Sequence, residues 1–277
     1  MLKLILSSFI FFISTSLYAG SCCGGGAGTT QLMLGTTKAV FRSTFSNQTL
    51  LADSSSGANI KPRSENQIES IKTIATSMNY RTSYFSQIGF SLPIIEKTRN
   101  IDNEWRSSQG TGDLGLNAAY EFHPEYSSHQ FISQAFVFAQ ITLPTAPSLF
   151  TTKENNLLDT RGTGHYLYTT GVLARKKIGF NDLTLQAALT YRAPEVFKGG
   201  LLTQEETSTK SSLDNIISIA HSYSFSSAFS TSAVISRSYI DNKSTSVFIG
   251  KSQSSLVYQS SIGTIYSTDN MILVQLI

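Results

Sequence analysis

The sequence predicts an all-β fold, a transmembrane up-and-down antiparallel β-barrel of about twelve strands. Three observations predict it: long segments in which apolar and polar residues alternate, connections that are short and long in turn, and aromatic residues gathered near the strand ends. Of the 277 residues, 14% are charged, 40% hydrophobic and 11% aromatic. The charged fraction is below the roughly 25% of soluble domains. No basic patch is present, so we expect no nucleic-acid partner.

The N-terminus predicts a signal peptide. Lys3 is followed by an apolar run from Leu4 to Ile13 and then by the small residue Ala19, an order typical of secretory signals. The run is shorter than the ~20 residues that a membrane-spanning helix needs. We therefore expect an exported chain that resides in the cell outer membrane. Its parts would be a signal peptide at 1–19, a flexible Cys/Gly-rich leader at 20–36 and an outer-membrane β-barrel at 37–277.

Both cysteines of the chain, Cys22 and Cys23, fall in the predicted leader. No disulfide can therefore link distant parts of the fold. Three glycines follow the pair and no His lies nearby, so we expect a chemically idle leader and neither a metal site nor another cofactor.

Alternation with a period of two is the main secondary-structure signal. It is clearest in 113–122, where Leu114, Leu116 and Tyr120 share one face, and in 182–192. Most such segments reach the 9–11 residues that a tilted membrane strand requires. Strands are predicted near 37–46, 69–81, 83–95, 112–123, 130–144, 164–178, 182–193, 213–226, 228–240, 244–251, 254–266 and 269–277.

The connections between the first eight of these strands alternate in length. Long connections rich in Ser, Thr, Asn and Gly are predicted at 47–68, 96–111, 145–163 and 194–212, with short turns between. Membrane barrels alternate in this way, with short periplasmic turns and longer external loops. Pro93 and Pro144 are expected at strand ends, because proline lacks the N–H donor of a ladder.

Aromatic residues form two outward-facing groups, one at each end of the strands. Between the groups the outward positions are mostly aliphatic or small, as expected of a membrane belt. The group at the short-turn end is Tyr80, Tyr84, Tyr120, Phe122, Phe131, Tyr223, Phe225 and Phe229. The group at the long-loop end is Phe45, Tyr166, Tyr168, Tyr191, Tyr239 and Tyr266.

Polar and charged side chains are predicted on the inward face of the same strands. They are candidates for lining a polar, weakly selective lumen. Alternatively they pair across the lumen and seal it, and at about twelve strands barrel size does not decide between the two. The candidates are Glu69, Arg81, Asp113, Asn117, Glu121, Gln134, Arg175, Asp182, Gln186 and Arg192.

Three short motifs carry a family resemblance over roughly residues 84–193. They are Gly110-Thr111-Gly112-Asp113-Leu114, Leu143-Pro144-Thr145-Ala146 and Arg161-Gly162-Thr163-Gly164, followed by Phe180-Asn181-Asp182-Leu183. In this order they resemble a bacterial outer-membrane transporter-like β-barrel family, the phenol-degradation meta-pathway outer-membrane proteins. Ala146 departs from the glycine usual in that family. The resemblance implies an outer-membrane barrel that carries small molecules.

Two functions of a membrane barrel stay open. One is a channel or transporter for passive uptake of small molecules, hydrophobic or aromatic ones among them. The other is a sealed barrel that acts as a surface adhesin or structural outer-membrane protein through its long loops. Both imply outer-membrane lipid and the barrel-insertion machinery as partners. An exported soluble β protein is disfavoured by the aromatic groups and the long strands.

Enzymatic activity is not expected. The sharpest enzymatic alternative, an outer-membrane lipase, would need a Ser beside an outward-facing His221. Its neighbours Ser222 and Ser224 face inward by alternation, and no nucleophile motif is present. A metal site at His123 and His129 is disfavoured by the intervening Pro124 turn.

Overall fold

The structure is a computed structural model. It describes residues 38–50, 52–55, 59–62, 69–101, 104–124, 134–153, 157–200, 207–225, 229–240, 255–267 and 272–276. The predicted signal peptide, the leader with Cys22 and Cys23, and the predicted strand 244–251 lie outside these residues. No helix in the described ranges is long and apolar enough to cross a membrane.

β-Strands make up the regular structure of the described residues. Their bounds are β1 Ala39–Leu50, β2 Ala52–Ser55, β3 Asn59–Pro62, β4 Glu69–Arg81, β5 Ser86–Ile101, β6 Glu104–Thr111, β7 Leu114–His123, β8 Gln134–Leu143, β9 Leu167–Ile178, β10 Asn181–Arg192, β11 Val196–Phe197, β12 Thr207–Ser208, β13 Ser212–Ser224, β14 Phe229–Ile240, β15 Ser255–Ser267 and β16 Ile272–Leu276.

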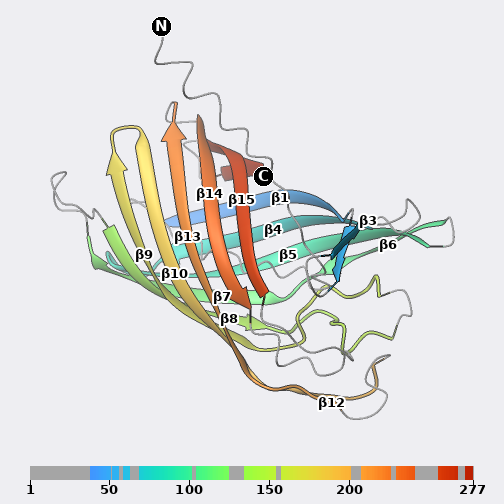
Figure 1. Cartoon of the computed structure of the whole chain (residues 1–277). Helices are drawn as coiled ribbons and strands as arrows, with labels where there is room; N and C mark the ends of the chain where they lie inside the picture. Colours follow the sequence, from blue (N-terminus) through green and yellow to red (C-terminus); the bar gives the residue numbers. More distant parts are fainter. Residues whose placement is uncertain are drawn as a thin grey trace, which may run out of the picture.

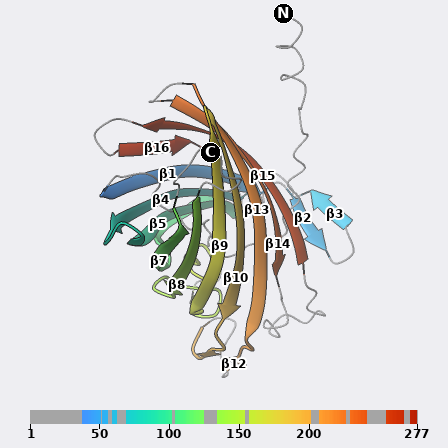
Figure 2. The ribbon, with the colours of Figure 1, turned by 90° about the vertical axis from the view of Figure 1, so that its left-hand side faces the viewer.

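The long strands form one curled antiparallel sheet, seen from two sides in Figures 1 and 2. Its order is β4-β1-β16-β15-β14-β13-β10-β9-β8-β7-β5-β6, and β4 also pairs with β5, so the ladder returns on itself. The pairing of β1 with β16 is parallel, and the other ladders of the sheet are antiparallel. The predicted all-β antiparallel barrel class is thus confirmed. The strand number stays a prediction, because β6 and β7 share one edge of β5.

The predicted loop at 96–111 is wrong. β5 continues to Ile101 and returns as β6, so this connection is a β-hairpin that prolongs the wall. The predicted connections 47–68 and 194–212 also carry short ladders, β2 with β3 and β11 with β12. By contrast, the described part of 145–163 contains a single isolated bridge, between Ser148 and Gly162. The tight turn at Gly179 and Phe180 is confirmed, with Gly179 at a φ of 58°.

Pro93 lies inside β5 and does not end a strand. A residue in a strand directs its N–H and its C=O to the same neighbour, and the carbonyl of Pro93 accepts from the N–H of Gly112 at 2.8 Å. The missing donor of Pro93 therefore faces Gly112 and Asp113, where the partner strand is interrupted between β6 and β7. The interruption makes the proline tolerable. Pro144, in contrast, follows the last residue of β8, as predicted.

The two faces of the sheet alternate as predicted. Leu116, Val172, Leu185 and Ile217 are exposed on the outer face, whereas Gln186 and Ser218 are buried on the inner one. The described aromatic residues of both groups are exposed, and several contact one another at the strand ends. The ring pairs are Tyr168 with Tyr191 at one end, and Phe85 with Tyr120, Phe180 with Tyr223 and Tyr223 with Phe225 at the other. The side chains of Phe131, Phe229, Tyr239 and Tyr266 lie outside the described part.

Candidate functional site

The inner face of β7, β8, β9, β10 and β13 is divided into three layers by depth. A polar layer lies near the short turns, an apolar layer lies in the middle, and a second polar layer lies near the long connections. Each layer takes residues from neighbouring strands because the ladders are in register. The polarity of the inner face therefore changes twice along these strands.

The layer near the short turns is a network of charge and amide groups. Arg175 Nε donates to both carboxylate oxygens of Asp182, at 2.8 and 2.7 Å, and Arg175 Nη2 completes the ion pair. Arg175 Nη1 also donates to Oε1 of Gln134 at 3.2 Å, whose amide nitrogen donates to Glu121 at 3.1 Å. The network therefore joins β7, β8, β9 and β10 along the wall.

The middle layer is an apolar cluster. Phe136 and Phe138 on β8 are each 2% exposed, and they pack with Leu173. Gly171 lies under one ring, since a Cβ there would stand 2.7 Å from Cζ of Phe138. Ala119 and Ala188 complete the cluster, and the partly buried Ile216 packs against it. Sequence reasoning missed this cluster, although the run Ala135-Phe-Val-Phe-Ala139 in β8 is apolar on both faces, which is typical of a strand buried on both sides.

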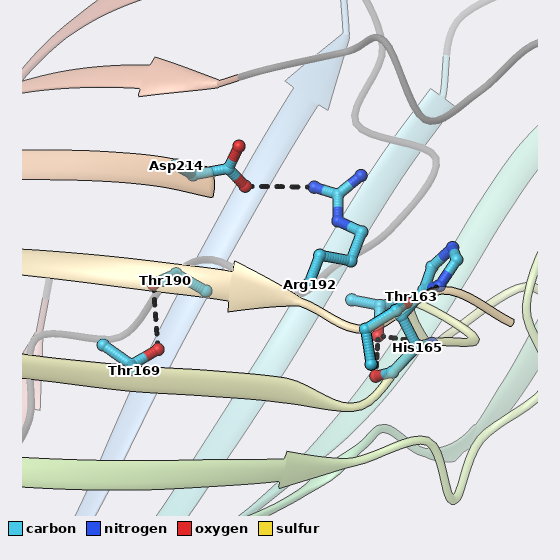
Figure 3. A network of polar contacts seen from close by, with 7 residues as sticks. Thr163, His165, Thr169, Thr190, Arg192 and Asp214 are labelled. Carbon is cyan, nitrogen blue, oxygen red and sulfur yellow. Dashed lines mark hydrogen bonds and ion pairs between the residues drawn. The ribbon is translucent and has the colours of Figure 1, made fainter. Parts of the chain in front are cut away.

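The layer near the long connections is polar again. Figure 3 shows Arg192 on β10 paired with Asp214 on β13 at 3.2 Å, and Thr169 bonded to Thr190 at 2.9 Å. A further ion pair, Arg99 with Glu69, joins β5 and β4. These ion pairs, like that of Arg175 with Asp182, link neighbouring strands and lie along the wall.

The predicted lining residues lie on the face opposite to the exposed aliphatic side chains. Glu69, Glu121 and Gln186 are buried, and the other candidates are half-buried. The backbone N–H of Arg81 donates to the carbonyl of Lys38 at 2.8 Å. Oδ1 of Asn117 is buried and has no hydrogen-bond partner among the described residues. The structure brings Glu121, Gln134, Arg175 and Asp182 into one network and leaves Arg81 and Asp113 elsewhere. Their role in lining a channel stays a prediction.

The connection between β8 and β9 lies on the inner wall. We call its described residues, 144–153 and 157–166, the mouth segment. Lys97 on β5 is 1% exposed, and its Nζ donates to Oγ1 of Thr160 at 3.1 Å. Nη1 of Arg161 donates to Oγ of Ser108 on β6 at 2.8 Å. These bonds attach the mouth segment to the hairpin of β5 and β6.

Asp113, between β6 and β7, binds both arms of the mouth segment. Its Oδ2 accepts from the N–H and the hydroxyl of Thr163, at 2.7 and 2.9 Å, and its Oδ1 accepts from the N–H of Ala146 at 3.2 Å. Thr145 adds two bonds, donating to the carbonyl of Gly112 at 3.2 Å and accepting from the N–H of Leu114 at 3.0 Å. Asp113 therefore acts as an anchor of the mouth segment.

An aromatic cluster joins the mouth segment to the next long connection. Phe150 stacks on Phe197 of β11 with ring centroids 4.5 Å apart, and His165 meets both rings edge-on. Burial first, and the charge of Arg192 second, lower the pKa of His165 to about 4. The hydrogen bond of Nδ1 with the carbonyl of Ala193, at 3.2 Å, opposes this shift. Figure 3 shows His165 beside Thr163 near the end of β10. His165 is therefore neutral at pH 7.

No cluster of three potential metal ligands occurs among the described residues. His123 lies in β7, and His129 lies outside the described part. His221 is exposed on the outer face, as predicted, and its Nε2 lies 3.1 Å from Oδ1 of Asn181.

Comparison with known proteins finds similarity in fold. No family model matches the sequence, and no curated protein matches it. Among solved structures, the fold is similar to the crystal structure of the COG4313 outer membrane channel from Pseudomonas putida F1, with a TM-score of 0.64. The match covers 86% of this chain and 85% of that chain, at 11% sequence identity. At this identity the likeness shows the fold alone.

Proposed function

We propose that the protein is an outer-membrane β-barrel channel for passive uptake of small molecules, hydrophobic or aromatic ones among them. One observation carries the proposal. The same strands expose aliphatic side chains between two aromatic groups on the outer face and carry polar and charged groups on the inner face. Such strands suit a wall with lipid on one side and a polar interior on the other.

The fold comparison supports the outer-membrane setting. The solved structure with a similar fold is described as an outer membrane channel, and the match extends over most of both chains. The motif resemblance to the phenol-degradation meta-pathway outer-membrane proteins is a second, weaker support for aromatic permeants.

The direction of the inner-face ion pairs favours a channel over a sealed barrel. Arg175 with Asp182, Arg192 with Asp214 and Arg99 with Glu69 each join strands that are neighbours in the sheet. Pairs of this kind neutralise charge along the wall without crossing the interior. Salt bridges across the interior would instead fill it with side chains.

The apolar middle layer supports hydrophobic permeants in particular. Phe136, Phe138 and Leu173 are packed at half depth, and they would offer dispersion contacts to an apolar molecule whose entry displaced them, while the polar layers above and below are satisfied within the wall. An ion would gain no comparable stabilisation from the apolar side chains at this depth.

The sealed barrel remains the second candidate. The near-complete burial of Phe136 and Phe138 favours it, because buried rings on the inner face occupy space that a channel would leave open. In that case the long connections would carry the function as an adhesive or structural surface. We propose no enzymatic activity for either candidate.

Single-channel recording tests the two candidates. The purified, refolded protein is first shown to be folded by heat-modifiable gel mobility and is then added to a planar bilayer. Discrete conductance steps that benzyl alcohol blocks, and that glucose at equal concentration does not, would support the channel and its permeant class. A folded protein without conductance would favour the sealed barrel. A mature protein soluble without detergent would refute both.

The apolar layer provides a sharper variant for the same experiment. Phe138→Ala removes a ring from the inner face, whereas Leu116→Ala removes a side chain of the outer face. For a channel, we expect Phe138→Ala to weaken the block by benzyl alcohol and Leu116→Ala to leave it unchanged. Equal block in both variants would contradict the assignment of the apolar layer to the permeant path.

A further inference from the structure

We infer that the mouth segment, residues 144–153 and 157–166, is a constriction that narrows the external entrance of the barrel, and that Asp113 is the positioning residue that holds it. The inference rests on the proposed channel function, whose entrance it describes. It is carried by the path of the segment, by its burial and by its two anchors.

The path of the mouth segment takes it across the inner face of the wall. The segment joins β8 to β9, yet it bonds to Lys97 on β5 and to Ser108 on β6, and β7 lies between β8 and β5 in the sheet. Lys97 belongs to the inward set of β5, together with Gln87 and Ile95, which are buried. Because β6 is the neighbour of β5 at Lys97, the segment crosses the junction of β6 and β7 on the lumen side.

The burial of the mouth segment shows that it is packed against the wall. Ser148 is 0% exposed, and Thr152, Leu158 and Thr160 are also buried. A connection that extended into solvent would leave such side chains exposed. The backbone at Gly162 is also closely packed, because a Cβ added there would stand 2.4 Å from Oδ1 of Asp113 and 2.7 Å from the carbonyl oxygen of Ala146.

Asp113 joins residues from three of the sequence motifs. Asp113 comes from the motif at 110–114, Ala146 from the motif at 143–146 and Thr163 from the motif at 161–164, and all three meet at one carboxylate. Hydrogen bonds to a carboxylate are stronger than bonds between neutral groups. The carboxylate binds one residue from each arm, so it holds the segment at both of its ends.

The aromatic cluster forms the second anchor, away from β5 and β6. Phe150 and His165 of the segment contact Phe197, which belongs to the connection between β10 and β13. The segment thus links the hairpin of β5 and β6 to the far side of β10 at the external end of the strands. A molecule entering from that end would pass along the segment before it reached the apolar layer.

Single-channel conductance of Asp113→Ala tests the inference. Loss of the carboxylate removes one bond to Ala146 and two to Thr163, and so weakens the hold on both arms. We therefore expect the unit conductance to rise about twofold or more as the entrance widens. Thr163→Val keeps the backbone N–H and loses only the hydroxyl, so it should give a smaller rise. Glu104→Ala is the matched control, because it removes an exposed acidic side chain from the tip of the hairpin without touching the segment.

Thiol labelling gives a readout that does not depend on conduction. In a chain in which Cys22 and Cys23 are replaced by Ser, Ser148→Cys places a thiol at a fully buried position and Lys153→Cys places one at an exposed position of the same segment. With a membrane-impermeant maleimide, we expect Asp113→Ala to speed labelling at 148 about tenfold or more, as the loss of a bond to a charged group implies. Labelling at 153 should stay fast in both backgrounds.

The outcomes separate the inference from the channel proposal. Larger conductance together with faster labelling at 148 supports the constriction. Wild-type conductance in a folded Asp113→Ala overturns it, whether or not labelling accelerates. If neither the wild type nor Asp113→Ala conducts, the channel proposal fails and the constriction with it. Should Asp113→Ala not pass the heat-modifiability test, Thr163→Val is judged by the same criteria.

Discussion

At the scale of single residues, the mouth segment depends on side chains that tolerate little change. His165 is 2% exposed and neutral, with Arg192 as the charged group that acts on it and Phe150 and Phe197 packed against its ring. Arg192 is itself paired with Asp214. A second positive charge placed beside this pair has no partner in the cluster, so protonation of His165 should loosen the segment.

The first prediction concerns pH. The pKa of His165 is about 4 in the native state, below its ordinary value of 6.5, so the released state binds the proton more strongly. The docking free energy is therefore fully present above pH 6.5 and falls as the pH drops from 6.5 towards 4, by up to about 3 kcal/mol. Because the thiolate is the reactive form, the labelling rate at Ser148→Cys is divided by the rate at Lys153→Cys at the same pH. This ratio should rise as the pH falls through the window. In His165→Gln the ratio should stay constant, and an equally steep rise in that variant would contradict the assignment.

The second prediction compares the two glycine motifs. In Gly162→Ala the new Cβ would clash with the backbone carbonyl of Ala146 as well as with Asp113, whereas in Gly110→Ala it would meet the guanidinium of Arg161, which can move. We expect Gly162→Ala to lower the free energy of unfolding by about 1–3 kcal/mol and Gly110→Ala to cost clearly less. Urea unfolding in detergent micelles measures both. A larger loss for Gly110→Ala would argue against the close approach at Gly162.

At the scale of elements, alternation along β8 decides which side chains enter the interior. Phe138 packs with the buried cluster, and its neighbour Val137 is exposed on the outer face. Backbone hydrogen bonding also depends on the neighbouring strand. Pro93 lacks an N–H donor, and it is accommodated inside β5 because the adjacent strand is interrupted there, between β6 and β7. The irregularity at Pro93 is thus matched by an irregularity in the adjacent strand.

The third prediction tests the alternation in β8. Phe138→Ala leaves a cavity in a well-packed cluster and should lower the free energy of unfolding by about 3–5 kcal/mol. Val137→Ala removes an outward side chain that a micelle or lipid can replace, and it should cost about 1 kcal/mol or less. Equilibrium urea unfolding of both variants provides the measurement. Equal losses would mean that the two faces of β8 are not distinct.

At the scale of the whole molecule, the outer face should behave as a surface in contact with lipid. Its aliphatic residues lie between two groups of aromatic rings, and the ladders return on themselves, so the described sheet exposes this face around its circumference. On such a face, a charged side chain lowers the unfolding free energy most at the middle of the membrane and least near its two surfaces.

The fourth prediction measures that penalty within one strand. Ile217 lies near the middle of β13 and Leu213 near its external end, and both are exposed on the outer face. In lipid vesicles, we expect Ile217→Arg to lower the unfolding free energy by about 2–4 kcal/mol and Leu213→Arg by about 0–1 kcal/mol. Similar small losses at both depths would contradict a membrane-embedded barrel.

The fold class, most strand positions and the two faces of the sheet could be predicted from local patterns in the sequence. The predicted strand 69–81 coincides with β4, and Leu116, Leu185 and Ile217 face outward as their alternation requires. These features depend on a period of two that is written locally in the chain, so no knowledge of distant partners is needed.

The contacts of the long connections and the packing of the inner face could not be predicted from local patterns and are seen only in the folded chain. Residues 96–111 were predicted as a loop because they are polar, and their sequence does not indicate that the end of β5 pairs with β6. Asp113 reads as one more inward carboxylate, and its bonds to Ala146 and Thr163 span 33 and 50 residues of sequence. Phe136 and Phe138 form a cluster only because Leu173 and Ala188 lie beside them in register. Contacts between residues far apart in sequence depend on how strands are ordered around the barrel, and a local pattern does not encode that order.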